Sequence, residues 1–470
     1  MNAEDIISQG SHSLDRLYRQ YRKTPNGVVV SFRDLCSSWP WAKRSDIFTH
    51  LIHSYPAKIL PYIPIYFLTT EQYVSRDGII MDVFSGSSTV LLESIVHPVY
   101  PRDAYGVEIN PLARLIAKVK TTAIQPEFIT VAFNKVVNLA KKTKQSKIPN
   151  YKKLDIWYSQ QKQESLGKLA FAIDTTEMTD DVRDFLLVCF STTSRKCSYS
   201  DPDIPVPVRL AIKNNSSIKR RELVTKLLEE IESTDVIHLF SVLVDKNILR
   251  LRSFNEVVQI TGKKASIVGD DARKLQFSHL GPRGSLNRTN VRPFESDSID
   301  CIITSPPYGA AQKYMRASRL ESLWAGLSSQ DDITALEKNS IGTEAIAESK
   351  LKALISTGYP EIDARLGKIA KKKLAKACLE SMYFRDMDQA ISEMKRVIKP
   401  GGTLILVIGD NKVIGKPMLN HSYLKLMAQS KGLRTDLILK DPVRSRGMMT
   451  KRHETAGMIS ADWVLVFRKE

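Results

Sequence analysis

The chain has 470 residues, of which 43% are apolar, and it carries a formal net charge of +18 with a pI near 9.5. This basic excess is typical of a protein that binds a polyanion such as nucleic acid. No uninterrupted apolar stretch approaches ~18–20 residues, which excludes a membrane-spanning helix, and the acidic first residues lack the apolar core of a signal peptide. We therefore expect no membrane partner and a cytoplasmic location.

The cysteines indicate reduced thiols and no metal site. Five of them are scattered singly along the chain. None forms a Cys-x-x-Cys pair, which makes a zinc site unfavourable. Their odd number and wide spacing are typical of a reducing compartment.

The first part of the chain leads into a strand and a turn of small residues. Residues 1–50 combine a basic helical run with an aromatic segment, and we interpret them as an N-terminal arm on the main domain. A proline-bracketed loop, His53–Pro64, precedes a helix. The apolar run Gly78–Phe84 predicts a strand, which is followed by the small residues Ser85–Thr89 and a helical pattern.

A second strand, predicted over Ala104–Ile109, contains an acid near its end. Glu108 lies about 20 residues after the glycine turn, the spacing at which an acid meets a ribose hydroxyl in dinucleotide-binding folds. Small residues between a strand and a helix also let backbone N–H groups approach a ligand. Together the strand, turn, helix and acid predict a nucleoside cofactor site.

The middle of the chain has a different character. Residues 125–259 are mostly helical in pattern and contain lysine runs, so we interpret them as an insertion into a sheet domain formed by residues 51–124 and 260–470. Basic faces of this density could follow phosphates, although a solvated helix surface explains any single lysine equally well. A smaller insertion rich in lysine and alanine is predicted over residues 330–377.

The rest of the chain returns to an alternating pattern. Further strands are predicted at Ala265–Val268, Ile299–Thr304, Thr403–Ile408 and Asp462–Phe467. A helix over Tyr383–Ile398 is expected to end at Lys399–Gly402, because proline cannot continue it and glycine turns the chain. Strands alternating with helices predict an α/β fold, with a doubly wound, mostly parallel, Rossmann-like sheet that binds ligands at the carboxyl ends of its strands.

The sequence Ser305-Pro306-Pro307-Tyr308 follows one of these strands directly. Neither proline can donate to a sheet ladder and each fixes its own φ near −65°, so the chain should leave the sheet in one rigid shape. A hydroxyl and a carbonyl before an aromatic ring suit a planar –NH2 group, whose hydrogens the oxygens accept. A plain proline turn with a surface tyrosine is the alternative for this stretch taken alone.

At this point the sequence resembles amino-directed DNA methyltransferases that use S-adenosylmethionine, most closely those that methylate N4 of cytosine. The resemblance is carried by the cofactor loop Asp82–Thr89, the acid strand Gly106–Pro111, the acidic turn Gly269–Leu275, the catalytic stretch Thr304–Gly309 and the upstream loop His53–Pro64. It covers nearly the whole chain. The order of these motifs resembles the subgroup in which target recognition lies between cofactor loop and catalytic strand, which implies recognition by residues 125–259.

The resemblance also implies roles for individual residues. It implies catalytic roles for Ser305, Pro306, Pro307 and Tyr308. It implies cofactor-binding roles for Tyr55, Pro56, Lys58, Asp82, Phe84, Ser85, Gly86, Ser87, Thr89, Glu108, Ile109, Asn110, Asp270 and Asp271. The target base would be flipped out of the duplex, and neither a metal nor a covalent intermediate would be needed.

Two positions depart from the family pattern. Ser88 replaces the second glycine of the cofactor loop, and Val83 replaces the proline after its acid. If residue 88 needs a positive φ, serine is strained there where glycine would not be. A basic loop near the end, with Arg444, Arg446 and Arg452, is a candidate for binding target-strand phosphates or a solvated hairpin.

Several functions remain open on the sequence alone. N6 of adenine is the nearest alternative target, because the same geometry serves a larger base. The Pro-Cys nucleophile of enzymes that methylate carbon-5 of cytosine is absent. Methylation of RNA or of a protein glutamine resembles an Asn-Pro-Pro-Tyr pattern more than this one, and a non-catalytic DNA-binding protein that kept the fold is a further alternative. A methyltransferase of this kind would have DNA, and a cognate restriction endonuclease, as partners.

Overall fold

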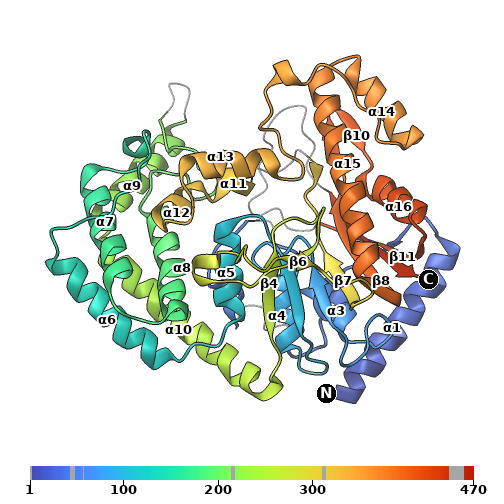
Figure 1. The fold of residues 1–470 in the computed structure, drawn as a ribbon, viewed down its shortest axis with the longest axis horizontal. Coiled ribbons are helices and arrows are strands. Elements are labelled where there is room, and N and C mark those ends of the chain that lie inside the picture. Colours follow the sequence, from blue (N-terminus) through green and yellow to red (C-terminus); the bar gives the residue numbers. More distant parts are fainter. Residues whose placement is uncertain (1–2, 43–47, 57, 213–216, 310–313, 444–459) are drawn as a thin grey trace.

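A computed structural model describes residues 3–42, 48–56, 58–212, 217–309, 314–443 and 460–470. Its centre is an eight-stranded sheet with the order β1-β11-β12-β8-β7-β2-β3-β4 (Figure 1). In chain order these strands are β1 (Val28–Val29), β2 (Ile80–Asp82), β3 (Ala104–Val107), β4 (Ala265–Gly269), β7 (Ile299–Thr304), β8 (Ile398–Gly409), β11 (Leu433–Pro442) and β12 (Ala461–Lys469).

Most of the sheet is parallel. The strands β4, β3, β2, β7 and β8 run in one direction, whereas β12 is antiparallel to both of its neighbours, β8 and β11. The two-residue strand β1 pairs with β11 in parallel. The predicted α/β class, with a mostly parallel Rossmann-like sheet, is confirmed.

Both faces of the sheet are buried, as the continuous apolar runs of its strands require. Ile303 and Ile405 pack in one core cluster with residues of α1, α3 and α4. Their neighbours Ile302 and Leu404 point to the other face and pack with residues of α14, α15 and α16. These helices are α1 (Ala3–Lys23), α3 (Tyr62–Leu68), α4 (Thr89–Val96), α14 (Pro360–Ala370), α15 (Leu374–Val397) and α16 (Asn420–Ser430).

The N-terminal residues form part of the sheet as well as a helix against it. Helix α1 is longer than the basic run in the sequence suggested, because Ile6, Leu14 and Leu17 form a buried stripe along it. After α1 the chain enters the sheet, where Val28 lies opposite Leu439. The partner strand β11 was not predicted from the sequence, and the short helix α2 (Phe32–Leu35) follows β1.

The insertion predicted from its helical pattern does consist of helices, which form the lobe on the left of Figure 1. They are α6 (Pro126–Lys142), α7 (Gln160–Thr175), α8 (Asp180–Lys196), α9 (Ile218–Ser233) and α10 (Val236–Thr261). Of these helices, α6, α7, α8 and α10 share one apolar core cluster with α5 (Pro111–Thr121), which lies beside the sheet. Phe185 and Phe240 are fully buried in this cluster. The lobe is thus continuous with the sheet domain.

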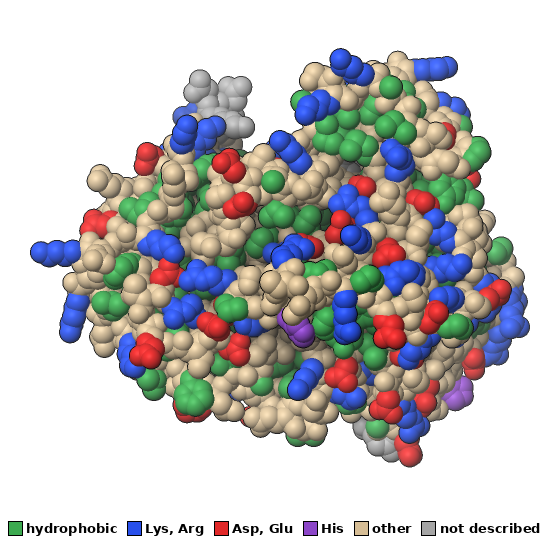
Figure 2. Space-filling model, in the orientation of Figure 1, with side chains coloured by type: hydrophobic (Ala, Val, Ile, Leu, Met, Phe, Trp, Pro, Cys, Tyr) green, Lys and Arg blue, Asp and Glu red, His purple; other side chains and the backbone are tan. Residues whose placement is uncertain are grey.

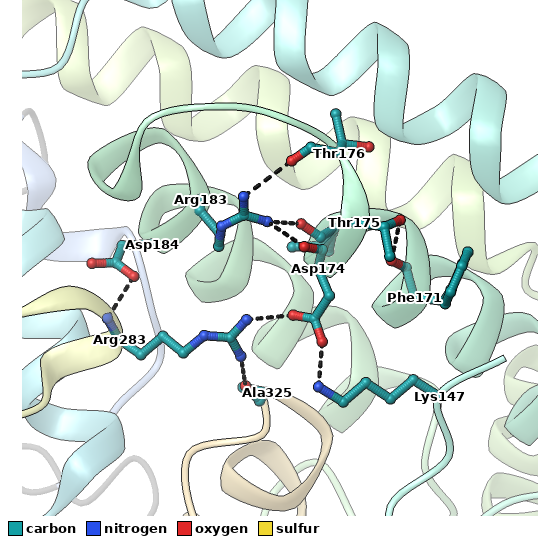
Figure 3. Close-up of polar contacts among 10 residues, drawn as sticks. Lys147, Phe171, Asp174, Thr175, Thr176, Arg183, Asp184, Arg283 and Ala325 are labelled. Atoms are coloured by element: carbon teal, nitrogen blue, oxygen red, sulfur yellow. Dashed lines mark hydrogen bonds and ion pairs between the residues drawn. The ribbon is translucent and has the colours of Figure 1, made fainter.

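A polar network also joins the lobe to the sheet domain (Figure 3). Arg283 forms an ion pair with Asp174 of α7, and its backbone N–H donates to Asp184 of α8 over 2.8 Å. Lys147 forms a second ion pair with Asp174. The carboxylate of Asp184 also accepts from Lys118 of α5 over 2.7 Å. Because Asp184 is only 1% exposed, these bonds satisfy a buried charge.

The segment after the catalytic strand is largely helical, with a groove beside it. It contains α11 (Tyr314–Ala317), α12 (Arg319–Trp324) and α13 (Gln330–Asn339). The polar groove is lined by α13 residues together with Val206 and Pro207 of the helical lobe. The second predicted insertion therefore contains α13 and α14, and α14 contributes Ile362, Leu366 and Ile369 to the core.

The helix predicted over Tyr383–Ile398 does end before Lys399, but the strand predicted from Thr403 begins earlier, at Ile398. Helix α15 ends at Val397, and the prolyl-glycyl stretch after it lies inside β8. The pairing of β8 with β7 moves from Ile398 opposite Ile299 to Thr403 opposite Cys301, so the extra residues form an irregularity in the ladder. The prolyl-glycyl stretch therefore follows the helix end and also forms an irregularity in the next strand, which only the strand partner reveals.

The remaining strands form two small hairpins. They are β5 (Gln276–Phe277) with β6 (Arg292–Pro293), and β9 (Asn411–Val413) with β10 (Lys416–Met418). All five cysteines are buried and free of disulfides. Within the described ranges, no helix combines the length and apolar character needed to cross a membrane. The same ranges contain no cluster of three or more His, Cys, Asp or Glu residues suited to a metal ion.

Candidate active site

The predicted cofactor loop and the predicted catalytic stretch lie next to each other. They follow β2 and β7, which are adjacent parallel strands. The Thr304 hydroxyl donates to Asp82 over 2.6 Å, and the Phe84 N–H donates both to Asp82 and to the Thr304 oxygen, each over 3.1 Å. Burial raises the pKa of Asp82 to about 7, although the hydrogen bonds that its carboxylate accepts from Thr304 and Phe84 oppose the shift. This group of bonds holds the ends of the two strands together.

A pocket opens at these strand ends, with an empty volume of about 730 Å³ that includes its open mouth. Its lining is Tyr55, Val83, Phe84, Gly86, Val107, Glu108, Ile109, Asp270, Asp271, Ala272, Arg273, Ser305, Pro307, Tyr314, Met315, Asn339, Ser340 and Ile341. The pocket therefore combines residues from both predicted motifs with residues from α11 and from the end of α13.

The cofactor loop makes a tight turn into helix α4. Gly86 has a φ of 49° and Ser88 has a φ of 60°, so both lie in the left-handed region. The positive φ considered for residue 88 is thus present. The Ser88 hydroxyl lies 2.7 Å from that of Ser85, a hydrogen bond that glycine could not make. Beneath the loop, a Cβ at Gly106 would come within 2.8 Å of the Ser85 Oγ, so the neighbouring strand must carry a glycine there.

Glu108 lies at the end of β3, with its carboxylate at the wall of the pocket. Its Oε2 accepts the Gly86 N–H over 2.7 Å, and its Oε1 accepts the Asn110 N–H over 2.8 Å. Burial raises the pKa of Glu108, while these two hydrogen bonds and the charge of Arg114 act in the opposite direction. The carboxylate is therefore anchored at the cofactor loop and has acceptor capacity left for ligand hydroxyls.

The upstream loop contributes one residue to the pocket wall. The Tyr55 hydroxyl accepts from the Asn110 side chain over 3.2 Å, and Asn110 also donates to Ser318 over 2.8 Å. Lys58 instead donates to the backbone carbonyls of His50 and His53, over 3.0 and 2.9 Å. Asn110 thus connects the upstream loop to the beginning of α12, whereas Lys58 closes its own loop.

The acidic turn after β4 carries arginine partners. Asp270 forms an ion pair with Arg288. Asp271 accepts from both the backbone N–H and the guanidinium of Arg273, over 2.9 Å each. Both carboxylates line the pocket, and the arginines hold them in place at its rim.

The stretch after β7 is fixed from three other elements. On α15, the Tyr383 hydroxyl donates to the Pro307 carbonyl over 2.8 Å. On β9, the Asn411 side chain donates to the Tyr308 carbonyl over 3.5 Å. On β12, Asp462 accepts from the Tyr308 hydroxyl over 3.3 Å. The Tyr308 ring is half-buried and packs against the core cluster below the sheet edge.

The structure brings together part of the predicted set. The predicted residues that line the pocket are Tyr55, Phe84, Gly86, Glu108, Ile109, Asp270, Asp271, Ser305 and Pro307. Those that stand outside the lining, behind it or beside it, are Pro56, Lys58, Asp82, Ser85, Ser87, Thr89, Asn110, Pro306 and Tyr308. Several of the latter hold lining residues in place through the contacts above, and their roles at the site stay predictions.

Sequence reasoning missed the contribution of the segment after the catalytic stretch. Tyr314 and Met315 of α11, and Asn339 to Ile341 at the end of α13, line the pocket. No local pattern marks them, because they reach the site only through the packing of α11 and α13 over the strand ends. The proposed phosphate-binding residues Arg444, Arg446 and Arg452 lie outside the described residues.

The face shown in Figure 2 is notched between its two upper parts, and α13 lies at the base of this notch (Figures 1 and 2). Lys and Arg side chains are found on both sides of the notch and are interspersed with Asp and Glu over the rest of this face. The positive charge on this view is therefore distributed, without one continuous basic patch.

Comparison with known proteins shows what the C-terminal part of this site is similar to. Residues 299–470 match the N6/N4 methyltransferase family, whose model is described as DNA methylase. Over these residues the chain is similar to the N6/N4 DNA methylase family. The family implies S-adenosylmethionine as the methyl donor and DNA as the substrate. The matched residues begin at β7 and include the whole Ser-Pro-Pro-Tyr stretch.

Similarity to three curated proteins extends over about four fifths of the chain. The chain is 26% identical over 388 residues to the type II methyltransferase M.MvaI of Kocuria varians, covering 78% of this chain and 77% of the relative. It is 24% identical over 415 residues to the type II methyltransferase M.AvaI of Nostoc sp. and of Anabaena variabilis, covering 80% of this chain and 77% of each relative.

The pocket suits the cofactor that the family implies. An acceptor-only carboxylate, Glu108, can take ribose hydroxyls. Ile109 and Phe84 provide apolar walls for a planar base, and the small residues of the cofactor loop bring backbone N–H groups to the pocket. The donor and acceptor types present therefore fit S-adenosylmethionine.

Proposed function

We propose that this protein transfers a methyl group from S-adenosylmethionine to the exocyclic N4 of a cytosine in a specific DNA sequence. The observation that carries the proposal is the hydrogen bonding between the cofactor loop and the end of the catalytic strand. Thr304, Asp82 and Phe84 bond the end of the catalytic strand to the beginning of the cofactor loop. These bonds support a methyl donor and a target base meeting at one edge of the sheet.

Each residue of the catalytic stretch has a distinct part in this proposal. The lone pair of the cytosine amine is delocalised into the ring, so the amine is a poor nucleophile. Hydrogen bonds from its N–H groups to the Ser305 hydroxyl and the Pro306 carbonyl favour a pyramidal nitrogen whose lone pair faces the pocket. The cofactor supplies an electrophilic methyl group on a sulfonium, and in-line placement provides most of the acceleration.

The base must leave the duplex to reach this corner. Flipping costs a few kcal/mol, and stacking on the Tyr308 ring returns about 1–3 kcal/mol of it. The ring is half-buried, with its hydroxyl held on Asp462, so we propose that the base stacks on its open face. The proton released from the amine after transfer goes to water.

Adenine N6 is the second candidate target, because it presents the same –NH2 group to the same corner. Serine in the first position of the tetrapeptide favours cytosine. The decisive experiment is to incubate DNA with the protein and S-adenosylmethionine, digest it to nucleosides, and identify the product by mass spectrometry. N4-methyl-2′-deoxycytidine supports the proposal, whereas N6-methyl-2′-deoxyadenosine shows that the target is adenine. DNA that stays unmethylated under conditions where the cofactor binds supports a non-catalytic DNA-binding protein.

Variants test the residue assignments separately. We expect Ser305→Ala and Tyr308→Ala to abolish or strongly reduce methylation while leaving cofactor affinity nearly intact. Glu108→Ala should instead weaken cofactor binding in a calorimetric titration, because it removes the carboxylate at the pocket wall. Wild-type turnover in both of the first two variants, or unchanged affinity in the third, refutes the corresponding assignment.

We further propose that residues 125–259 recognise the target sequence and that the protein acts beside a cognate restriction endonuclease. Support comes from the relatives, which are type II methyltransferases, and from the helical lobe that forms one side of the notch in Figure 2. The basic loop is a separate proposal. A double substitution of Arg444 and Arg446 should lower the slope of DNA affinity against salt, and an unchanged slope excludes a phosphate role.

A further inference from the structure

The hydroxyl of Tyr308 lies between two other polar groups at the catalytic corner. On one side, the Ser305 Oγ is 3.4 Å away. On the other side, the Asp462 Oδ1 is 3.3 Å away. Asp462 comes from β12, two strands from β7, and lies opposite Gly409 of β8 in the sheet. The oxygen atoms of these side chains thus connect Ser305, the proposed contact for the amine, through Tyr308 to the carboxylate of Asp462.

The acid decides in which direction these hydrogen bonds run. A hydroxyl can donate or accept, but an ionised carboxylate can only accept. The hydrogen of Tyr308 is therefore directed at Asp462, which leaves the Tyr308 oxygen to accept the hydrogen of Ser305. Once its own hydrogen is engaged in this way, the Ser305 oxygen presents only lone pairs toward the site.

We propose that Asp462 is a positioning residue that acts through the Tyr308 hydroxyl to keep Ser305 a hydrogen-bond acceptor for the target amine. The inference rests on the proposed function, in which Ser305 contacts that amine. It adds an acid 154 residues away from Tyr308 in sequence, which no motif in the chain indicates. Without the acid, the Ser305 hydroxyl could turn its hydrogen toward the amine and repel it.

The charge of Asp462 depends on the groups around it. Among the described residues, Tyr308 faces it from the end of β7 and Asp441 from β11. Burial raises the pKa of Asp462 to about 6, the Tyr308 hydrogen bond opposes this shift, and the negative charge of Asp441 adds to it. The carboxylate is thus ionised at neutral pH, and it becomes a possible donor only below about pH 6.

The test compares Asp462→Asn, Tyr308→Phe and the double variant in single-turnover methylation, together with cofactor affinity by calorimetry. The asparagine variant replaces an obligate acceptor by a group that can also donate. Tyr308→Phe keeps the ring and removes the hydroxyl that connects acid and serine. A hydrogen bond to a charged group corresponds to about a tenfold to hundredfold effect. We expect each single variant to lose rate by about this factor with unchanged cofactor affinity, and the double variant to lose no more than either.

A matched control is another tyrosine–aspartate pair. The Tyr359 hydroxyl donates to Asp388 of α15 over 2.5 Å, away from the pocket lining. Asp388→Asn should leave the rate within about twofold of wild type. Asp462→Glu, which keeps an obligate acceptor, should recover part of the rate and shows whether the asparagine variant merely misfolds.

The pH profile gives an independent readout. The wild-type rate should fall as pH drops through about 6, and Asp462→Asn should lack this limb. The inference is refuted if Asp462→Asn is as fast as wild type, or if it slows the Tyr308→Phe variant further. In both cases wild-type methylation remains, which separates this failure from a failure of the proposed function, where wild-type protein leaves DNA unmethylated.

Discussion

Substitutions at Ser88 would separate two opposing energies in the cofactor loop. Ser88 is fully buried at the N-terminus of α4, with φ 60° and ψ 48°. A left-handed conformation costs a residue with a Cβ about 1–2 kcal/mol. The hydrogen bond between the hydroxyls of Ser88 and Ser85, 2.7 Å long, contributes about 1 kcal/mol in the other direction.

Alanine and glycine at this position both remove the hydrogen bond to Ser85, but only glycine relieves the backbone strain. Ser88→Ala keeps the strain and loses the bond, so we expect the free energy of unfolding to fall by about 1 kcal/mol. Ser88→Gly also loses the bond but relieves the strain, while the freer unfolded chain offsets about 0.4–1 kcal/mol of that gain. The glycine variant should therefore be more stable than the alanine variant by about 1 kcal/mol.

Urea unfolding followed by circular dichroism measures both variants, provided that their slopes against urea agree. A matched control is Ser253, inside α10, where the order should reverse, since glycine is about 1 kcal/mol less favourable than alanine in a helix interior. If alanine equals or exceeds glycine at position 88, the loop is not strained there. A cofactor titration of the glycine variant then shows whether the hydroxyl pair also shapes the binding site.

Two further predictions concern buried charges. Lys120 is fully buried, its Nζ donates to the Ser87 carbonyl over 3.0 Å, and burial holds its pKa well below the usual 10.5. The unfolded chain therefore holds a proton on this lysine that the folded chain has released. Between the lowered pKa of the folded state and the usual 10.5, the free energy of unfolding of the wild type rises with pH, by at most about 1.4 kcal/mol per pH unit. We expect Lys120→Met to be stabilising, with a gain that shrinks between pH 7 and pH 9 in urea unfolding. A gain independent of pH would contradict a lowered pKa. Asp184→Asn removes the buried partner of Lys118 and weakens the contact with Arg283, and should cost up to about 3 kcal/mol. A loss under about 0.5 kcal/mol, typical of surface positions, would show that the network is not a buried one.

Local pattern was sufficient for the strands that build the site. The apolar run before Ser305 and the run before the small residues of the cofactor loop are both strands. Glu108, at the end of the next strand, does lie at the wall of the same pocket. These features are local because strand propensity, turn residues and the spacing between them all lie within about 30 residues of one another.

Pattern was less reliable where a residue has two structural uses. The stretch Lys399–Gly402 follows the end of α15, as its composition predicted, but it also lies inside β8 as an irregularity in pairing. Strand β11 was missed for a different reason, because its apolar run, Leu437–Leu439, is only three residues long and is flanked by charged residues. Its identity as a strand depends on its partners β1 and β12.

By itself, the sequence of this protein determined the α/β class, the two motifs and the residue types that the pocket offers. Only the tertiary structure decided which strands are neighbours. That order places Asp462 at the Tyr308 hydroxyl and the end of α13 at the pocket wall. The physical reason is that periodicity fixes which face of an element is buried, whereas the partner it is buried against depends on contacts between residues more than a hundred positions apart.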